Sequence, residues 1–160
     1  MPMASLLDFL DKYGVRYTLT THPPAYTAQG VAALSHTPGR QMVKSVVVNI
    51  DGELALAVLP ASAQVDLDLL KKATRANTAR LAAEEEFRDI FCECELGAMP
   101  PFGNLYGMNV IADERLANNR EIAFNACSHR ELIHMEWEDF RALARPKMAK
   151  FTSSSMVQAA

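Results

Sequence analysis

The amino-terminal hydrophobic pattern predicts a helix followed by a short strand. Residues 5–13 place leucine and aromatic side chains at helical spacing on one stripe, and Gly14 ends the run. Residues 16–20 alternate apolar and polar positions, which is typical of a strand, and the two prolines after it end the strand because they lack amide donors. We expect a further short helix that begins at Thr27 and ends near Leu34.

The middle of the chain carries the strongest strand pattern. Residues 42–50 are rich in valine and isoleucine, and residues 54–59 form a second apolar run. Asp51 and Gly52 join the two runs, and an Asp-Gly pair between apolar segments is the strongest short signal for a β-hairpin. We therefore expect two long antiparallel strands here.

The remaining pattern mixes helices and strands. We expect helices over 66–74, 82–91 and 138–144, and strands over 108–112, 121–126 and 132–136. This order predicts a single α/β or α+β domain with a mixed, largely antiparallel central sheet surrounded by helices. We assign the domain to residues 1–150 and expect the small, polar residues 151–160 to be a disordered tail.

Composition and charge narrow the functional class. A chain of 160 residues with 49% hydrophobic and 22% charged residues is typical of one globular domain. It has no apolar run of about 18 residues and no basic leader, so we expect a cytoplasmic protein with no membrane contact. A net charge of −3 argues against a protein that coats a nucleic-acid duplex, although contact with one end of an RNA stays open. Residues 141–150 carry four cations and no acid, and either contact with phosphate or simple solvation explains them.

The three cysteines do not form a familiar metal-binding pattern. Cys92, Cys94 and Cys127 are odd in number, and the spacing of the first two is not that of a zinc knuckle. We expect free thiols in a reducing compartment.

Lys44 is the first candidate for chemistry. It interrupts a run of residues, 42–48, that otherwise suits a buried strand, and an unpaired buried ammonium is costly. A lysine at the entry of a strand can also extend to solvent, and the position alone favours neither explanation.

A loop rich in glycine and proline is the second candidate. In residues 97–103, two glycines flank two prolines, so the loop is stiff and still lets a ligand approach the main chain. The amides of Gly97, Ala98 and Met99 could hold a water or face a developing oxyanion. A tight connection between a helix and a strand gives the same pattern.

Small and polar residues between two predicted strands form the third candidate. Cys127 and His129 suggest a nucleophile and base, but residues two apart on an extended chain stand roughly 6.5–7 Å apart, too far for activation. Ser128 has no identified carboxylate for a hydrolytic triad. The other histidines, His22, His36 and His134, have no ligand spacing, so we expect no metal and no cofactor.

Together these features resemble the YbaK family, which includes free-standing deacylases and the editing insertion of bacterial prolyl-tRNA synthetases. The family's strand lysine matches Lys44, and its Gly-x-x-x-Pro loop matches Gly97 to Pro101, with Phe102 also familiar. The stretch 121–126 resembles the strand that leads to the pocket wall. The bulkier Ala126 to His129 departs from the glycine-rich element of many relatives, which leaves the amino acid open among cysteine, alanine, serine and threonine.

The resemblance implies hydrolysis of the ester between a wrongly attached amino acid and tRNA, by water and without metal. Catalytic residues would be Lys44, Gly97, Ala98, Met99 and Pro101. Substrate-binding residues would be Met42, Ser45, Val46, Phe102, Asn125, Cys127, Ser128 and His129. The partner would be the acceptor end of aminoacyl-tRNA, and docking on a synthetase or elongation factor stays open. The alternatives are an inactive module that binds aminoacyl-tRNA or a nucleotide, and a thiol enzyme that uses Cys127.

Overall fold

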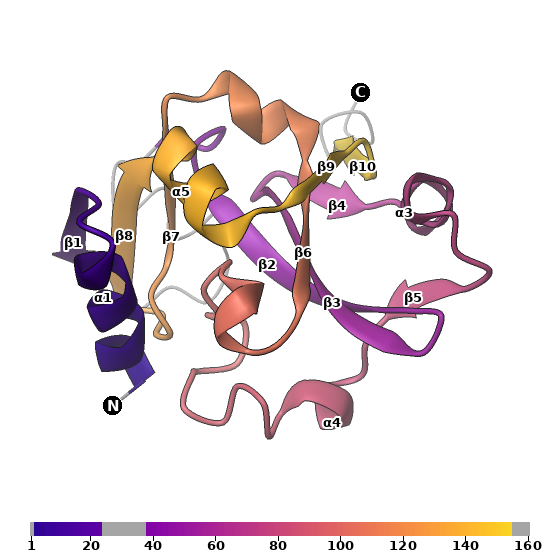
Figure 1. Cartoon of the computed structure of the whole chain (residues 1–160), viewed down its shortest axis with the longest axis horizontal. Coiled ribbons are helices and arrows are strands. Elements are labelled where there is room, and N and C mark those ends of the chain that lie inside the picture. Colours follow the sequence, from indigo (N-terminus) through magenta and orange to yellow (C-terminus); the bar gives the residue numbers. More distant parts are fainter. Residues whose placement is uncertain (1, 24–37, 155–160) are drawn as a thin grey trace.

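The computed structural model describes residues 2–23 and 38–154. They form a five-stranded and a three-stranded β-sheet, a separate pair of short strands and a few short helices (Figure 1). The strands are β1 (Tyr17–Thr21), β2 (Val43–Ile50), β3 (Glu53–Pro60), β4 (Ala63–Val65), β5 (Ala79–Leu81), β6 (Asn109–Asp113), β7 (Glu121–Asn125), β8 (Glu131–Glu136), β9 (Lys147–Ala149) and β10 (Thr152–Ser154). The helices are α1 (Pro2–Lys12), α3 (Leu67–Thr74), α4 (Glu84–Phe87) and α5 (Trp137–Ala144), with 3-10 turns η1 (Gly103–Leu105) and η2 (Glu114–Asn118). None of the helices in this part of the chain is long and apolar enough to cross a membrane.

Two sheets carry the fold. The larger has the strand order β5-β2-β3-β6-β9, the smaller has the order β1-β8-β7, and β10 pairs separately with β4. Pairing is antiparallel except for β3 with β6 and β6 with β9, which confirms the mixed, largely antiparallel prediction. A parallel bridge from Met42 to Ala123 connects the start of β2 to β7. The bridge brings the two sheets together where Lys44 lies.

The central hairpin forms as the Asp-Gly signal predicts. Ile50 pairs with Glu53, so Asp51 and Gly52 make a two-residue turn, with φ of 51° and 89°. Positive φ at both residues is what this hairpin turn requires, and aspartate and glycine tolerate it best. The Asp51 side chain also accepts hydrogen bonds from the amides of Asn77 and Thr78, each at 2.9 Å, which holds β5 beside the turn.

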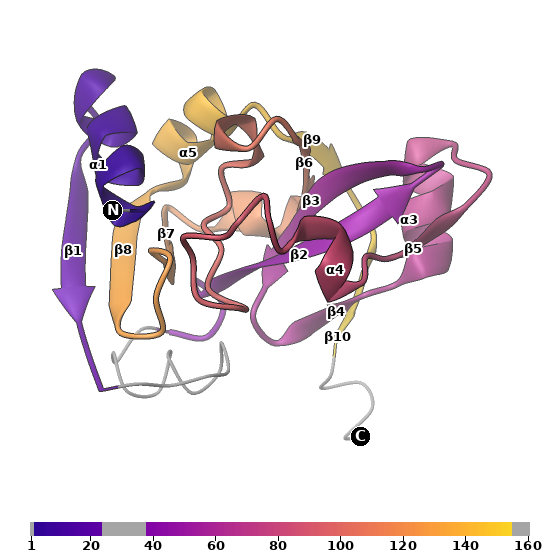
Figure 2. The same ribbon diagram turned by 90° about the horizontal axis from the view of Figure 1, so that it is seen from below.

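The main core lies on one side of the larger sheet. Figure 2 shows α1 and α5 on that side, and β4 and β10 on the other. Fully buried aromatic rings fill it, and Phe102 packs edge-on against Phe124 and Phe140 at centroid distances of 5.7 and 5.2 Å. A second cluster around Val48, Leu59 and Phe151 fills the opposite face.

Several element predictions need correction. The helix expected over 82–91 is only α4, and turns carry the chain on through Phe91, although Phe87 and Phe91 both face the core as the helical pattern implied. Strands β4, β5, β9 and β10 were not predicted because each has only three residues. Disorder was wrongly expected from residue 151: Phe151 is fully buried and Thr152 pairs with Val65. The helix expected over 27–34 lies outside the described residues.

Candidate functional site

Lys44 lies near the beginning of β2, paired with Leu59 of β3. Within residues 2–23 and 38–154, its ammonium forms no hydrogen bond or ion pair, and its side chain is half-buried. Desolvation by burial lowers the pKa of Lys44 below its ordinary value. A half-buried cation without a counter-charge costs free energy, so a bound anion would be the natural partner.

A single parallel bridge connects the segment of Lys44 to that of Asn125. The bridge between Met42 and Ala123 is parallel, so Lys44 and Asn125 each lie two residues beyond it in the same direction. Because side chains alternate along a strand, Lys44 shares the face of Met42, and Asn125 shares the face of Ala123. Met42 and Ala123 belong to one buried cluster, with Lys44 two residues on at the beginning of β2 and Asn125 two residues on at the end of β7.

Two buried polar atoms near this junction have no hydrogen-bond partner in the described part of the chain. They are Asn125 Oδ1 and Ser45 Oγ, although nearly all buried polar atoms in folded proteins are bonded. Ser45 follows Lys44 on the opposite face of β2, toward the main core to which Val43 and Val47 belong. Of the other expected wall residues on this strand, Met42 is fully buried and Val46 packs partly buried in the second cluster.

The Gly97 loop lies against the turn between β7 and β8. The Cys127 amide donates to the Ala98 carbonyl at 3.0 Å, and the Glu95 amide donates to the Cys127 carbonyl at 2.9 Å. Gly97 has a φ of 84°, in the left-handed region that favours glycine. A side chain there would meet His129, whose Cε1 lies 3.6 Å from the position of a Cβ atom.

The expectation of three free loop amides is only partly right. The Ala98 amide donates to the Glu95 carbonyl at 3.0 Å and is therefore occupied. The amides of Gly97 and Met99 donate to no other described residue. Two of these amides, not three, thus lack a hydrogen-bond partner among the described residues.

The second half of the loop is an anchor in the core. Pro100 and Pro101 are buried, and Phe102 is fully buried among aromatic rings, so the structure does not bring Phe102 to a surface. At Gly103 a Cβ atom would stand 2.7 Å from the Met108 carbonyl oxygen, which leaves room for glycine alone. The glycines and prolines therefore fix one end of the loop rigidly.

The prediction of three free thiols is wrong. Cys94 and Cys127 form a disulfide, whereas Cys92 is free and exposed. Cys127 has a φ of 69°, so it is not in the extended conformation that the strand argument assumed. The thiol enzyme hypothesis loses its nucleophile in this state, because the Cys127 sulfur is already bonded.

His129 is held by the segment that precedes the Gly97 loop. Its amide donates to the Glu95 carboxylate at 2.9 Å, and its Nε2 lies 2.7 Å from the Leu96 carbonyl oxygen. Because a carbonyl only accepts, Nε2 carries the proton in this contact, which fixes the ring. Ser128 donates to the Glu131 carboxylate at 3.1 Å. Glu95 was not singled out from the sequence, since nothing distinguished it within an acidic run.

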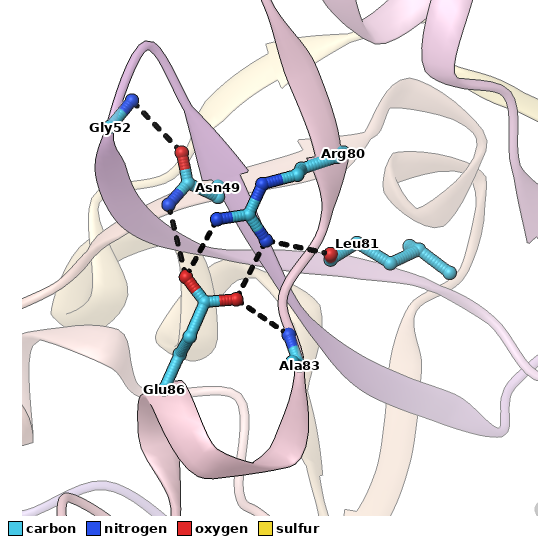
Figure 3. Close-up of polar contacts among 6 residues, drawn as sticks. All are labelled: Asn49, Gly52, Arg80, Leu81, Ala83 and Glu86. Carbon is cyan, nitrogen blue, oxygen red and sulfur yellow. Dashed lines mark hydrogen bonds and ion pairs between the residues drawn. The ribbon is translucent and has the colours of Figure 1, made fainter.

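A second polar cluster lies at the hairpin end of β2, away from Lys44 (Figure 3). Glu86 of α4 accepts two hydrogen bonds from Arg80, at 2.6 and 2.8 Å, one from Asn49 and one from the Ala83 amide. The Arg80 hydrogen bonds, and then the Ala83 amide, lower the pKa of Glu86 to about 2. Every acceptor is used, so this cluster fastens α4 to β2 and β5 and offers no site.

The remaining sequence candidates lie elsewhere. His134 pairs with Glu121 at 3.6 Å, His22 Nδ1 contacts the Pro23 carbonyl, and His36 lies outside the described residues. In the cationic segment, Lys147 donates to the Ala73 carbonyl at 3.1 Å, beside α3. Among the described residues, none of these interactions involves the Gly97 loop.

Comparison with known proteins identifies a family. A family model described as an aminoacyl-tRNA editing domain matches residues 22–143. The chain is 26% identical over 106 residues to the proline-tRNA ligase of Bacillus mycoides (strain KBAB4), which covers 66% of this chain and 18% of the ligase. It is 31% identical over 118 residues to the proline-tRNA ligase of Halalkalibacterium halodurans, covering 71% of this chain and 20% of the ligase. The match therefore spans about a fifth of these ligases.

Two solved structures share the fold. One, a hypothetical protein, superposes with a TM-score of 0.83 at 17% identity and covers 92% of this chain and 99% of its own. The other has been put forward as a trans-editing enzyme for prolyl tRNA synthetase. Its TM-score is 0.80 at 22% identity, covering 96% of this chain and 99% of its own. Identities this low establish the architecture alone.

Proposed function

Because the chain belongs to the aminoacyl-tRNA editing domain family, we propose that it hydrolyses the ester joining a wrongly attached small amino acid to tRNA. The observation that carries the proposal is Lys44, a half-buried cation with no partner in the described residues. Its position beside the junction of β2 and β7 suits an anionic ligand. The tRNA of proline is the first substrate to test, given the ligase relatives.

Lys44 binds a phosphate of the terminal nucleotides in this mechanism. Partial burial weakens competition from water, so the ammonium attracts an anion more strongly than a surface lysine does. The lowered pKa of Lys44 follows from the same desolvation, and an approaching phosphate raises that pKa again by favouring the charged form. Lys44 thereby positions the ester and need not remove a proton.

The Gly97 and Met99 amides stabilise the developing oxyanion or hold the attacking water. Backbone donors that are already in position need no reorganisation when negative charge develops on the oxygen. One such donor raises the reaction rate by a factor of about 10²–10³. His129, held beside Gly97 by Glu95 and Leu96, borders the same space. An aminoacyl ester is already reactive, so water activated by position suffices, without a covalent nucleophile or metal, and the neighbouring ribose hydroxyl assists.

Asn125 holds the amino acid. Every aminoacyl ester carries an α-ammonium group, and Asn125 Oδ1 is a buried acceptor that lacks a donor within the described residues. Ser45 Oγ lies on the opposite face of β2 from Lys44, so it is not placed to share this contact. A pocket distinguishes two amino acids that differ by one methylene or hydroxyl group by only about 1–3 kcal/mol. We therefore expect the protein to accept more than one of cysteine, alanine, serine and threonine.

A hydrolysis panel tests the proposal. The purified protein is incubated with tRNA charged separately with cysteine, alanine, serine, threonine and proline, with and without a metal chelator. We expect release of at least one small amino acid, unaffected by the chelator. Tight binding of these tRNAs without release would instead identify an inactive binding module, and loss of activity with chelator would refute the metal-free mechanism.

A further inference from the structure

The Cys94–Cys127 disulfide joins the segment that leads into the Gly97 loop to the turn between β7 and β8. Cys94 lies three residues before Gly97, and Cys127 lies two residues before His129. The non-covalent contacts between the same two segments run through Glu95, Leu96 and Ala98. The disulfide is therefore the one covalent connection, within the described residues, between the loop that offers free amides and the turn that carries His129.

We propose that Cys94 and Cys127 are a reversible redox modification site, at which a small disulfide such as oxidised glutathione closes the bond and a small thiol opens it. Closure fixes the Gly97 loop against His129, and opening loosens it. The effect on catalysis rests on the proposed function, because it requires the Gly97 and Met99 amides to act on the ester.

The two sulfurs differ in access, which sets the order of exchange. Cys127 is buried, with 3% of its surface exposed, whereas Cys94 lines a pocket of about 90 Å³ beside Phe91 and Leu96. An external thiolate attacks Cys94 Sγ and Cys127 leaves as a thiolate. A second external thiol then attacks the mixed disulfide, releasing Cys94 and one external disulfide. Two external thiols are oxidised and one protein disulfide is reduced, so electrons balance.

Tyr106 stands at the place where the leaving thiolate forms. Its hydroxyl lies 3.7 Å from Cys94 Sγ and 3.8 Å from Cys127 Sγ. Burial raises the pKa of Tyr106, so the phenol stays protonated and able to donate to a thiolate. A hydrogen bond to the charged form favours it, which makes Cys127 a better leaving group.

Peptide mapping tests the bond independently of any activity. The protein with Cys92→Ser is equilibrated with oxidised glutathione or with dithiothreitol, alkylated and digested with trypsin. In this variant the fragments 89–115 and 121–130 carry one cysteine each. We expect them linked under oxidised glutathione and separate under dithiothreitol. Separate fragments under both conditions, or linked fragments under both, overturn the inference.

Amide exchange and turnover then test the consequence. Reduction should speed hydrogen exchange in residues 95–99 and 127–130 and leave the β2–β3 hairpin unchanged. It should also lower kcat on the best tRNA substrate by at least about threefold, because small displacements of positioned groups cost rate. The Cys94→Ser and Cys127→Ser variants should lose this redox response, while Cys92→Ser should keep it. If no tRNA is hydrolysed, the proposed function fails, but the peptide mapping and the amide hydrogen exchange still test the redox site. Equal hydrogen exchange in the oxidised and the reduced protein overturns the inference.

Discussion

Replacing Gly97 by alanine adds one methyl group at a residue whose φ is 84°. The methyl group itself fits, because the nearest atom, His129 Cε1, would be 3.6 Å away. The cost is backbone strain, since a left-handed conformation costs an L-residue about 1–2 kcal/mol. For a chain of this size that corresponds to a fall of about 2–8 °C in Tm.

Gly52→Ala is the matched control. Gly52 has a φ of 89°, and a methyl group added there would meet no atom within 4 Å, so the variant carries the same strain without new contacts. It lies in the turn between β2 and β3, at the opposite end of β2 from Lys44. We therefore expect both variants to lose similar stability in thermal unfolding.

Only Gly97→Ala should lose activity. Relief of the strain rotates the peptide that bears the Gly97 amide, and a displacement of about 1 Å in a positioning group costs up to about 10² in rate. Initial rates of deacylation, measured well below both Tm values, should fall about 10–100-fold for Gly97→Ala and stay near wild type for Gly52→Ala. Equal activity in the two variants would refute the role of the loop.

Three further perturbations test other parts of the structure. Lys44→Met should leave urea unfolding unchanged or slightly more resistant, because it removes a desolvated charge that has no partner in the described residues, while deacylation falls. The depressed pKa of Glu86, about 2, stabilises the fold above pH 4.5 and loses that effect as pH falls toward 2; Glu86→Gln should unfold more readily at pH 7 and flatten this acid dependence in circular dichroism. Thr152→Val removes the 2.7 Å hydrogen bond to buried Asp113 and the 2.6 Å hydrogen bond from Arg115, and it should cost about 1–3 kcal/mol in denaturant titration; no loss would show that these two side-chain hydrogen bonds contribute little.

The fold was largely predictable where local chemistry decides it. The central hairpin follows from Asp51 and Gly52, whose positive φ values are a property of those two residues. β10 was not predictable, because Phe151 and Thr152 are ordered by partners far away in the sequence. Short strands of this kind depend on tertiary contacts more than on their own residues.

The candidate site, too, was predictable from the sequence only in part. Lys44 and the Gly97 loop were recognisable as an unusual cation and an unusual run of glycine and proline. Their setting was not, because the left-handed Cys127 and its bond to Cys94 arise only when the turn after β7 meets the loop after α4. The expectation of free thiols rested on the reducing conditions of the cell. It could not take account of the contact between Cys94 and Cys127, which are 33 residues apart in the sequence.

The central claim is that Lys44 anchors the terminal nucleotide of an aminoacyl-tRNA whose ester the protein hydrolyses. The most direct measurement is single-turnover hydrolysis of the best mischarged tRNA by wild type, Lys44→Ala and Lys72→Ala, an exposed lysine of α3. The account predicts that Lys44→Ala slows hydrolysis by about 10²-fold or more, as expected for loss of a positioning group, whereas Lys72→Ala matches wild type. Wild-type rates in Lys44→Ala would contradict it.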